Sequence, residues 1–211
     1  EAEAFAQAAL KAANVTGAQL AVIDKGKLVW SAAFGLRRLD PQLPMTRETT
    51  MWAASITKGV FAAYVMQLAE RGEMPLDTPV AAQLAKELNA YEPYAKTAAE
   101  LVRDPRWQSV TPRMLLSHSS GLLNFAFLEP GGVMRLHFQP GSKYSYSGEG
   151  LNLLQFVIEQ KKGKPLDQLM QDAIFTPLGM ARTGLIYRKE FEANVADRFD
   201  QNGKFRAQTR R

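Results

Sequence analysis

Cysteine is absent from the 211 residues, and histidine occurs only at positions 118 and 137. The lack of cysteine excludes disulfides, a thiolate nucleophile and cysteine-ligated zinc. Neither histidine belongs to an H-E-x-x-H motif or a comparable ligand cluster, and Gly131-Gly132 lacks the lysine and helix that follow in a phosphate-binding loop. We therefore expect no metal ion and no other cofactor.

Long apolar runs and basic stripes are also missing. No run reaches the roughly 20 residues that a helix needs to cross a bilayer. The formal charge is +5, but most of it comes from residues 182–211, and no basic stripe there alternates with aromatic residues. We expect neither a membrane span nor a nucleic-acid partner.

The first third of the chain predicts a helix, a hairpin and a loop. Residues 1–13 are rich in alanine and carry acids at their start, which predicts a helix. Residues 19–24 and 27–35 flank a Lys-Gly turn and predict a β-hairpin, and the prolines of residues 37–50 predict a loop. For the helix we expect these residues to face inward: Phe5, Ala9 and Leu10.

Ser55 and Lys58 form an S-x-x-K pattern ahead of an apolar stretch. If a helix opens near Ser55, the hydroxyl and the amine lie on one face, close enough for proton transfer. The stretch from Val60 to Ala69 has no polar face, which predicts a buried helix and a desolvated lysine that gives up its proton readily. The alternative is that Ser55 caps the helix and Lys58 reaches solvent.

Later segments predict further helices and a polar loop. Residues 142–150 form a loop that contains Tyr144 and Tyr146. The phenol of Tyr146 can relay a proton if the fold brings it to Ser55, and otherwise both tyrosines are half-buried loop aromatics. The remaining predictions are helical content in 81–101 broken at Pro93, a helix that starts at Thr111-Pro112, helices over 151–162 and 165–174, and a β-like end with an Asn202-Gly203 turn.

Four blocks, in this order, resemble the serine β-lactamase-like family, which includes class C β-lactamases, DD-peptidases and family VIII-type esterases. The blocks are Ser-Ile-Thr-Lys at 55–58, Thr-Pro-Arg-Met-Leu-Leu-Ser-His-Ser-Ser-Gly-Leu at 111–122, Pro-Gly-Ser-Lys-Tyr-Ser-Tyr-Ser-Gly at 140–148 and Pro-Leu-Gly-Met at 177–180. The resemblance implies an α+β, β-lactamase/transpeptidase-like fold with a helical lobe beside an antiparallel sheet. It also implies a periplasmic or secreted protein.

The same resemblance implies roles for individual residues. Ser55 is the acylated nucleophile, Lys58 its proton partner, and Tyr146 the tyrosine of the Y-x-N motif, acting first as base and then as acid. Substrate is expected to lie against Ser55 and Gly148. The implied division is residues 1–50 for the N-terminal helix and hairpin, 51–180 for the mainly helical lobe, and 181–211 for the start of the return to the sheet.

Two features depart from the family pattern. Gly148 stands at the third position of Y-x-N, so the amide that would bind a substrate side chain is missing. The family's later K-T-G or H-x-G motif is also missing. We therefore expect the chain to be the N-terminal portion of a longer hydrolase, its sheet completed by a C-terminal fragment or a second chain.

Two functions from different classes remain. The first is a serine hydrolase that acts through an acyl-enzyme on a small ester, amide or β-lactam, including D-amino-acid peptides and short-chain esters. The second is a non-catalytic binding or scaffold module that keeps the fold, which Gly148 and the missing motif favour. A serine-histidine triad is not expected, because His118 is predicted to make structural hydrogen bonds at a helix end and His137 to be packed or solvated.

Overall fold

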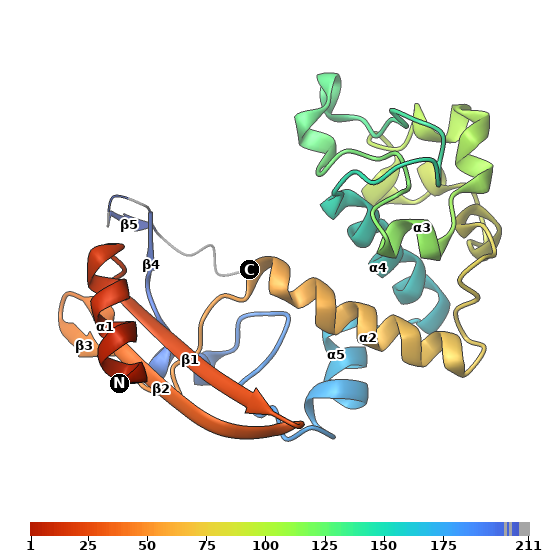
Figure 1. Ribbon diagram of the computed structural model, residues 1–211. Coiled ribbons are helices and arrows are strands. Elements are labelled where there is room, and N and C mark those ends of the chain that lie inside the picture. Colours follow the sequence, from red (N-terminus) through yellow and green to blue (C-terminus); the bar gives the residue numbers. More distant parts are fainter. Residues whose placement is uncertain (201, 203, 207–211) are drawn as a thin grey trace. The chain divides into compact units, whose positions relative to one another are not determined.

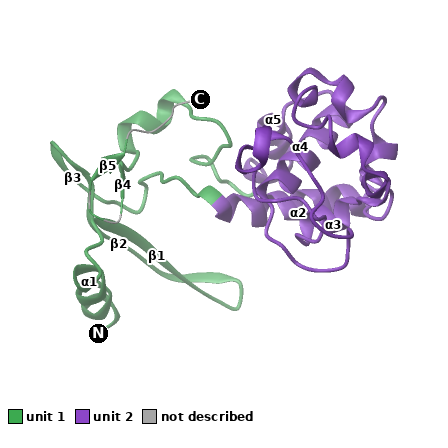
Figure 2. Cartoon of the chain, turned by 90° about the horizontal axis from the view of Figure 1, so that it is seen from above, with its two compact units in different colours: residues 1–54, 178–211 green, residues 55–177 purple. Residues whose placement is uncertain are grey.

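The structure is a computed structural model that describes residues 1–200, 202 and 204–206. The chain forms two compact units, residues 1–54 with 178–211 and residues 55–177 (Figure 2). Helices and strands both occur, as the α+β prediction requires. The three-segment division made from the sequence stays a prediction.

The first unit begins with α1 (Ala2–Ala12), followed by an antiparallel sheet in the order β1 (Gly17–Asp24), β2 (Lys27–Leu39), β3 (Gln42–Pro44) (Figure 1). The predicted hairpin is confirmed, with its turn at Lys25 and Gly26 in left-handed conformation. The predicted loop over 37–50 is wrong in part, because β2 extends to Leu39 and pairs with β3. Two residues of β4 (Arg198–Phe199) pair with β5 (Phe205–Arg206), and Gly203 of the predicted turn lies outside the described residues.

The core of this unit lies between α1 and β2. Ala6 is buried against Ala32 and Phe34, and Leu10 packs at the edge of this cluster. The inward placement of Leu10 is confirmed, whereas that of Phe5, which is 77% exposed, is wrong. Ala9 is exposed as well. A small residue facing the sheet lets the helix approach it closely, which turns the bulky phenylalanine outward.

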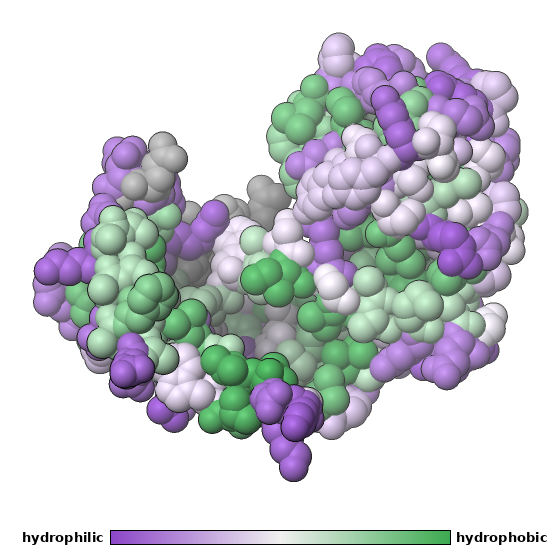
Figure 3. All heavy atoms as spheres, in the orientation of Figure 1, coloured by the Kyte–Doolittle hydropathy of each residue, from purple (hydrophilic) through white to green (hydrophobic). Residues whose placement is uncertain are grey.

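The hairpin carries apolar side chains on its surface. Figure 3 shows hydrophobic residues gathered along β1 and β2, next to the hydrophilic turn. The large apolar residues exposed on these two strands are Leu20, Val22, Ile23, Leu28, Val29 and Leu39. A two-stranded hairpin with this much apolar surface is typical of one that packs against further structure.

The end of the first unit returns beside the residues that precede position 55. The Thr50 N–H donates to the Asn194 carbonyl (2.8 Å), and the Ala196 N–H donates to the Thr50 carbonyl (2.9 Å). The Thr49 hydroxyl donates to the Asn194 side-chain oxygen (2.9 Å). These bonds fix the position of Thr49 and Thr50, which precede the S-x-x-K pattern by a few residues.

The second unit is mainly helical, with α2 (Thr57–Glu70), α3 (Pro112–Leu116), α4 (Gly148–Lys162) and α5 (Leu166–Met170) as its α-helices. The predicted helix start is confirmed at α3, where the Thr111 hydroxyl accepts from the Met114 N–H (3.3 Å). The helical content predicted for 81–101 occurs as short 3-10 helices, but Pro93 lies inside one of them, Glu92–Tyr94, and does not break it. Helix α5 continues as a π-turn over Gln171–Phe175. In the described part of the chain, no helix has the length and apolar character needed to cross a bilayer.

The prediction that α2 is buried on every side is wrong. The side chains of Tyr64, Val65 and Leu68 are buried, but one face is exposed: Gly59, Ala63, Met66 and Glu70. Glycine and alanine add little apolar area, so leaving this face in water costs less than exposing the aromatic and branched face. Hydropathy alone did not distinguish the two faces.

Candidate active site

Ser55 lies in a 3-10 turn, Ala54–Ile56, that leads directly into α2. Its side chain is exposed, and Ala54 before it has a φ of 44°. Left-handed backbone costs a non-glycine residue about 1–2 kcal/mol, so this conformation is held by the surrounding structure. The turn places the hydroxyl at the N-terminus of a helix, where the dipole favours negative charge on oxygen.

Lys58 lies one turn further on and donates from Nζ to the Ser55 Oγ at 3.1 Å. The residue is half-buried. Lys58 is therefore not the core lysine that was expected, because it lies in the first turn of α2, directly after the exposed residues 51–56. The amine keeps access to water while it contacts the serine hydroxyl.

Tyr146 comes from a segment 91 residues downstream, and its hydroxyl lies 2.9 Å from the Ser55 Oγ. The Lys58 Nζ also lies 5.4 Å from the centre of its ring. Hydrogen bonding from Ser55 and from Lys58, together with the positive charge of Lys58, lowers the pKa of Tyr146 below its usual value. The three predicted chemical groups thus form one continuous hydrogen-bonded chain within the second unit.

His118 contacts the loop that carries Tyr146. Its carbonyl accepts from the Ser145 N–H (2.7 Å) and its Nδ1 accepts from the Ser147 N–H (3.1 Å). The imidazole and the Tyr146 ring have centroids 4.5 Å apart. The expectation of structural hydrogen bonds at His118 is confirmed, but the tyrosine loop as their partner was missed, because no sequence spacing links these positions.

Gly148 is buried, and its N–H donates to the Asn124 Oδ1 at 2.8 Å. The backbone carbonyl of Asn124 accepts from the Glu149 N–H at 2.6 Å. Asn124 therefore occupies the space beside the position where the family pattern has an asparagine side chain. No motif or spacing in the sequence predicts this contact.

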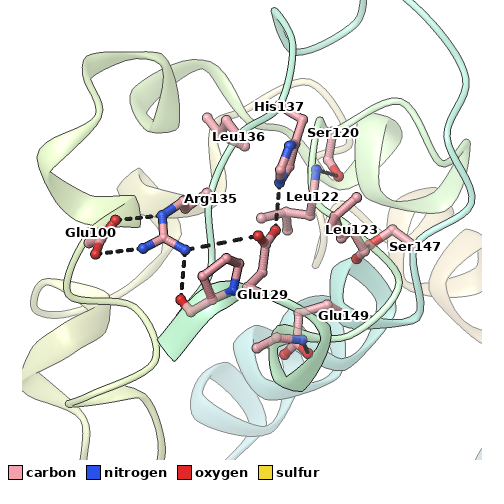
Figure 4. Close-up of polar contacts among 12 residues, drawn as sticks. Glu100, Ser120, Leu122, Leu123, Glu129, Arg135, Leu136, His137, Ser147 and Glu149 are labelled. Atoms are coloured by element: carbon pink, nitrogen blue, oxygen red, sulfur yellow. Dashed lines mark hydrogen bonds and ion pairs between the residues drawn. The ribbon is translucent and has the colours of Figure 1, made fainter. Parts of the chain in front are cut away.

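The first turn of α4 is held to the segment around Leu123 (Figure 4). The buried Ser147 hydroxyl donates to the Leu123 carbonyl (2.8 Å) and accepts from the Gly150 N–H (2.9 Å). The Glu149 carboxylate accepts from the Ala126 N–H at 2.8 Å. With their N–H groups satisfied, the residues that follow Tyr146 form a fixed helix start.

His137 makes a different contact, shown in Figure 4: its Nε2 lies 2.6 Å from the Oε1 of the buried Glu129. Arg135 pairs with Glu100 at 2.6 and 2.8 Å and lies 3.9 Å from Glu129. His137 is itself exposed, as one of the two predicted alternatives has it, but its pairing with Glu129 was missed. In the described part of the chain, no bond joins either histidine to Ser55, and no cluster of metal-ligating side chains forms.

The chain matches the model of the Beta-lactamase family over residues 2–210. It belongs to that family. The recognition made from the four sequence blocks is therefore confirmed, and so is the predicted β-lactamase/transpeptidase-like fold. The family comprises serine hydrolases: esterases, D-aminopeptidases, penicillin-binding proteins and β-lactamases.

Named members of the Beta-lactamase family resemble the chain over most of its length. Esterase EstB of Burkholderia gladioli is 29% identical over 84% of this chain and 49% of its own. A D-aminopeptidase of Brucella anthropi is 29% identical over 81% of this chain and 33% of its own. The octameric penicillin-binding protein homologue from Pyrococcus abyssi superimposes with a TM-score of 0.75 at 25% identity, covering 96% of this chain and 48% of that one. The chain thus spans half or less of the length of these relatives.

Proposed function

We propose that this chain carries the acylation machinery of a serine hydrolase that acts on an ester or amide. The observation that carries the proposal is the hydrogen-bonded chain from the Lys58 Nζ through the Ser55 Oγ to the Tyr146 hydroxyl, with distances of 3.1 and 2.9 Å. A hydroxyl between an amine and a phenol of lowered pKa is an activated nucleophile. In this proposal Ser55 is the nucleophile, and Lys58 and Tyr146 transfer the protons.

In acylation, the Ser55 Oγ forms a bond to the substrate carbonyl carbon while its proton passes to Tyr146. The carbonyl oxygen becomes negative, and the Ser55 N–H at the positive end of α2 is one donor that stabilises it. The proton on Tyr146 then passes to the leaving oxygen or nitrogen as its bond to carbon breaks. In deacylation, Tyr146 takes a proton from the water molecule that attacks the acyl carbon, and it returns this proton to the Ser55 Oγ as the bond between that oxygen and the carbon breaks.

Esters without an acylamino group are the proposed substrates. Gly148 has no side chain, and its N–H is already bonded to Asn124, so this position offers no amide to a peptide or β-lactam substrate. The Burkholderia relative is named an esterase, which agrees with this choice. β-Lactams and D-amino-acid peptides are the less favoured acyl donors.

The partner proposed for the first unit is further polypeptide that extends its sheet, from a C-terminal fragment or a second chain. The exposed apolar side chains of β1 and β2 support it, as does the coverage of half or less of the relatives' length. A periplasmic or secreted location is proposed from the family resemblance alone.

The test is covalent labelling with a fluorophosphonate, followed by peptide mapping. We expect the label on Ser55, none on a Ser55→Ala variant, and hydrolysis of p-nitrophenyl butyrate faster than that of nitrocefin. Label on a different residue would defeat the proposed mechanism. Equal background hydrolysis by the unaltered chain and Ser55→Ala would favour the second candidate, a non-catalytic binding module, for which Gly148 is the supporting observation.

A further inference from the structure

Tyr146 is held from both sides by a single residue. The Ser145 N–H, immediately before it, donates to the His118 carbonyl at 2.7 Å, and the Ser147 N–H, immediately after it, donates to the His118 Nδ1 at 3.1 Å. The imidazole also lies against the phenol ring, with centroids 4.5 Å apart and planes inclined by 39°. Backbone and ring of the tyrosine are thus fixed by the backbone and ring of His118.

The segment that presents His118 is itself well fixed. This segment follows α3 and is hydrogen-bonded to its last turn. The His118 N–H donates to the Leu115 carbonyl (3.3 Å), and the Ser119 N–H donates to the Met114 carbonyl (2.8 Å). His118 has a φ of 56°, a conformation that histidine, asparagine and aspartate adopt more readily than other non-glycine residues. This backbone geometry turns both acceptors toward the tyrosine loop.

The contact with the Ser147 N–H requires one protonation state. Nδ1 can accept only if it carries no proton, so the ring must be neutral with its hydrogen on Nε2. A protonated ring would present an N–H to another N–H, and the bond would be lost. The contact between His118 and residue 147 is therefore sensitive to acid.

The groups that face His118 keep it neutral. Among the residues that the structure describes, Lys58 on α2 is the charged group that acts on it, and the phenols of Tyr144 and Tyr146 are the other titratable groups in contact. Burial and the positive charge of Lys58 lower the pKa of His118. Its neutral form therefore extends below the pH range usual for a histidine.

We infer that His118 is a positioning residue: its neutral imidazole and its carbonyl hold Tyr146 at hydrogen-bond distance from Ser55. The consequence for catalysis rests on the proposed function, whereas the holding of the tyrosine does not. His118 acts through Tyr146 and takes no proton from Ser55, because its Nδ1 is occupied by Ser147. Acid then releases the tyrosine loop by protonating His118.

The first measurement reads the imidazole and needs no variant at position 118. The chain has two histidines, so long-range proton–nitrogen spectra of the 15N-labelled chain resolve both, and a His137→Asn variant assigns them. We expect His118 at neutral pH to carry its proton on Nε2 and none on Nδ1. A proton on Nδ1 at neutral pH would overturn the inference.

The second measurement compares His118→Asn with His118→Ala. Asparagine tolerates the left-handed backbone and places an oxygen close to the position of Nδ1, but it does not titrate. We expect fluorophosphonate labelling of Ser55 within about threefold of the unaltered chain for His118→Asn, and slower by about tenfold to a hundredfold for His118→Ala. The unaltered chain and His137→Asn should lose labelling rate in acid more steeply than His118→Asn.

The pKa of Tyr146 provides a readout that is independent of activity. With 13C-labelled tyrosine, and a Tyr146→Phe variant to assign the signal, we expect the pKa of Tyr146 to rise toward its usual value in His118→Ala but not in His118→Asn. Equal behaviour of the two variants, in labelling and in this titration, would refute the positioning role. If Ser55 is not labelled in the unaltered chain, the proposed function fails, and the tautomer and the tyrosine titration still decide the role of His118.

Discussion

A Cβ atom built on Gly148 would lie 2.8 Å from the Asn124 Oδ1, and it would also lie 2.8 Å from a ring carbon of Phe125. The backbone oxygen of Asn124 would be only 3.0 Å away. Gly148 departs from the family's Y-x-N pattern, and the packing around it also requires a residue without a side chain. Asn124 and residue 148 share one space, and only one of them carries a side chain into it.

We predict that Gly148→Ala lowers the free energy of unfolding by about 1–3 kcal/mol, because the added methyl group overpacks the site. The same substitution should cost less in an Asn124→Ala background, because the clashing side-chain oxygen is removed there while the backbone oxygen remains. Chemical denaturation measures both. The control is Gly59→Ala, an exposed helical position with nothing within 4 Å, which should stabilise the chain by up to about 1 kcal/mol. If Gly148→Ala left the free energy of unfolding unchanged, the packing argument would be contradicted.

The sequence predicted local features well. The hairpin turn, the cap at Thr111 and the spacing of Ser55 and Lys58 depend on residues a few positions apart, and the structure has all three. The meeting of Ser55 with Tyr146 was expected only through the family resemblance, because a separation of 91 residues leaves no periodic signal.

What the sequence did not predict depends on packing between distant segments. The contacts of Asn124 with α4 and of His118 with the tyrosine loop join residues 24 and 29 positions apart. The inward face of α1 was also wrong, because hydropathy favoured Phe5 whereas close approach to the sheet selects Ala6. The hydropathy of a helix face does not show which other element packs against that face.

Ser147 should contribute to stability out of proportion to its size. Its hydroxyl is buried, donates to the Leu123 carbonyl and accepts from the Gly150 N–H as the cap of α4. Ser147→Ala removes the cap and leaves a buried carbonyl without this donor, so we expect a loss of about 1–3 kcal/mol in the free energy of unfolding. Thermal or urea unfolding measures it. Ser142→Ala, at an exposed position, is the matched control and should change stability by less than about 0.5 kcal/mol.

Glu73 links the end of α2 to the last turn of α4 through its ion pair with Lys162, and it also pairs with Arg71. Hydrogen bonds from Lys162 and from Arg71 lower the pKa of Glu73 below its ordinary value of 4.5. The folded state therefore binds this proton less readily than the unfolded state does. The stabilisation is complete above the unfolded pKa and disappears as the pH falls through the folded one.

Glu73→Gln should consequently be less stable than the unaltered chain at neutral pH and should approach it in stability below about pH 4. Urea unfolding at a series of pH values measures the difference. Glu70→Gln, an exposed carboxylate at the end of α2, is the control and should stay within about 0.5 kcal/mol of the unaltered chain across the series. A constant difference between Glu73→Gln and the unaltered chain across the series would exclude the ion pair as its source.

Tyr146→Phe tests the proton transfer with little change in shape. The phenol hydroxyl bonds to Ser55 at 2.9 Å, and the exposed fraction of the residue is 39%, so its loss should leave the free energy of unfolding within about 1 kcal/mol. Labelling of Ser55 should slow by about a hundredfold or more, because a general base contributes at least that much. In the unaltered chain the rate should rise with pH as Tyr146 loses its proton, below the pH usual for a tyrosine because its pKa is lowered. Tyr144→Phe, two residues before Tyr146 and not bonded to Ser55, is the control and should keep both the rate and the pH dependence. If Tyr146→Phe also kept them, the phenol would not be the base, and Lys58 would be the remaining group in contact with the Ser55 Oγ.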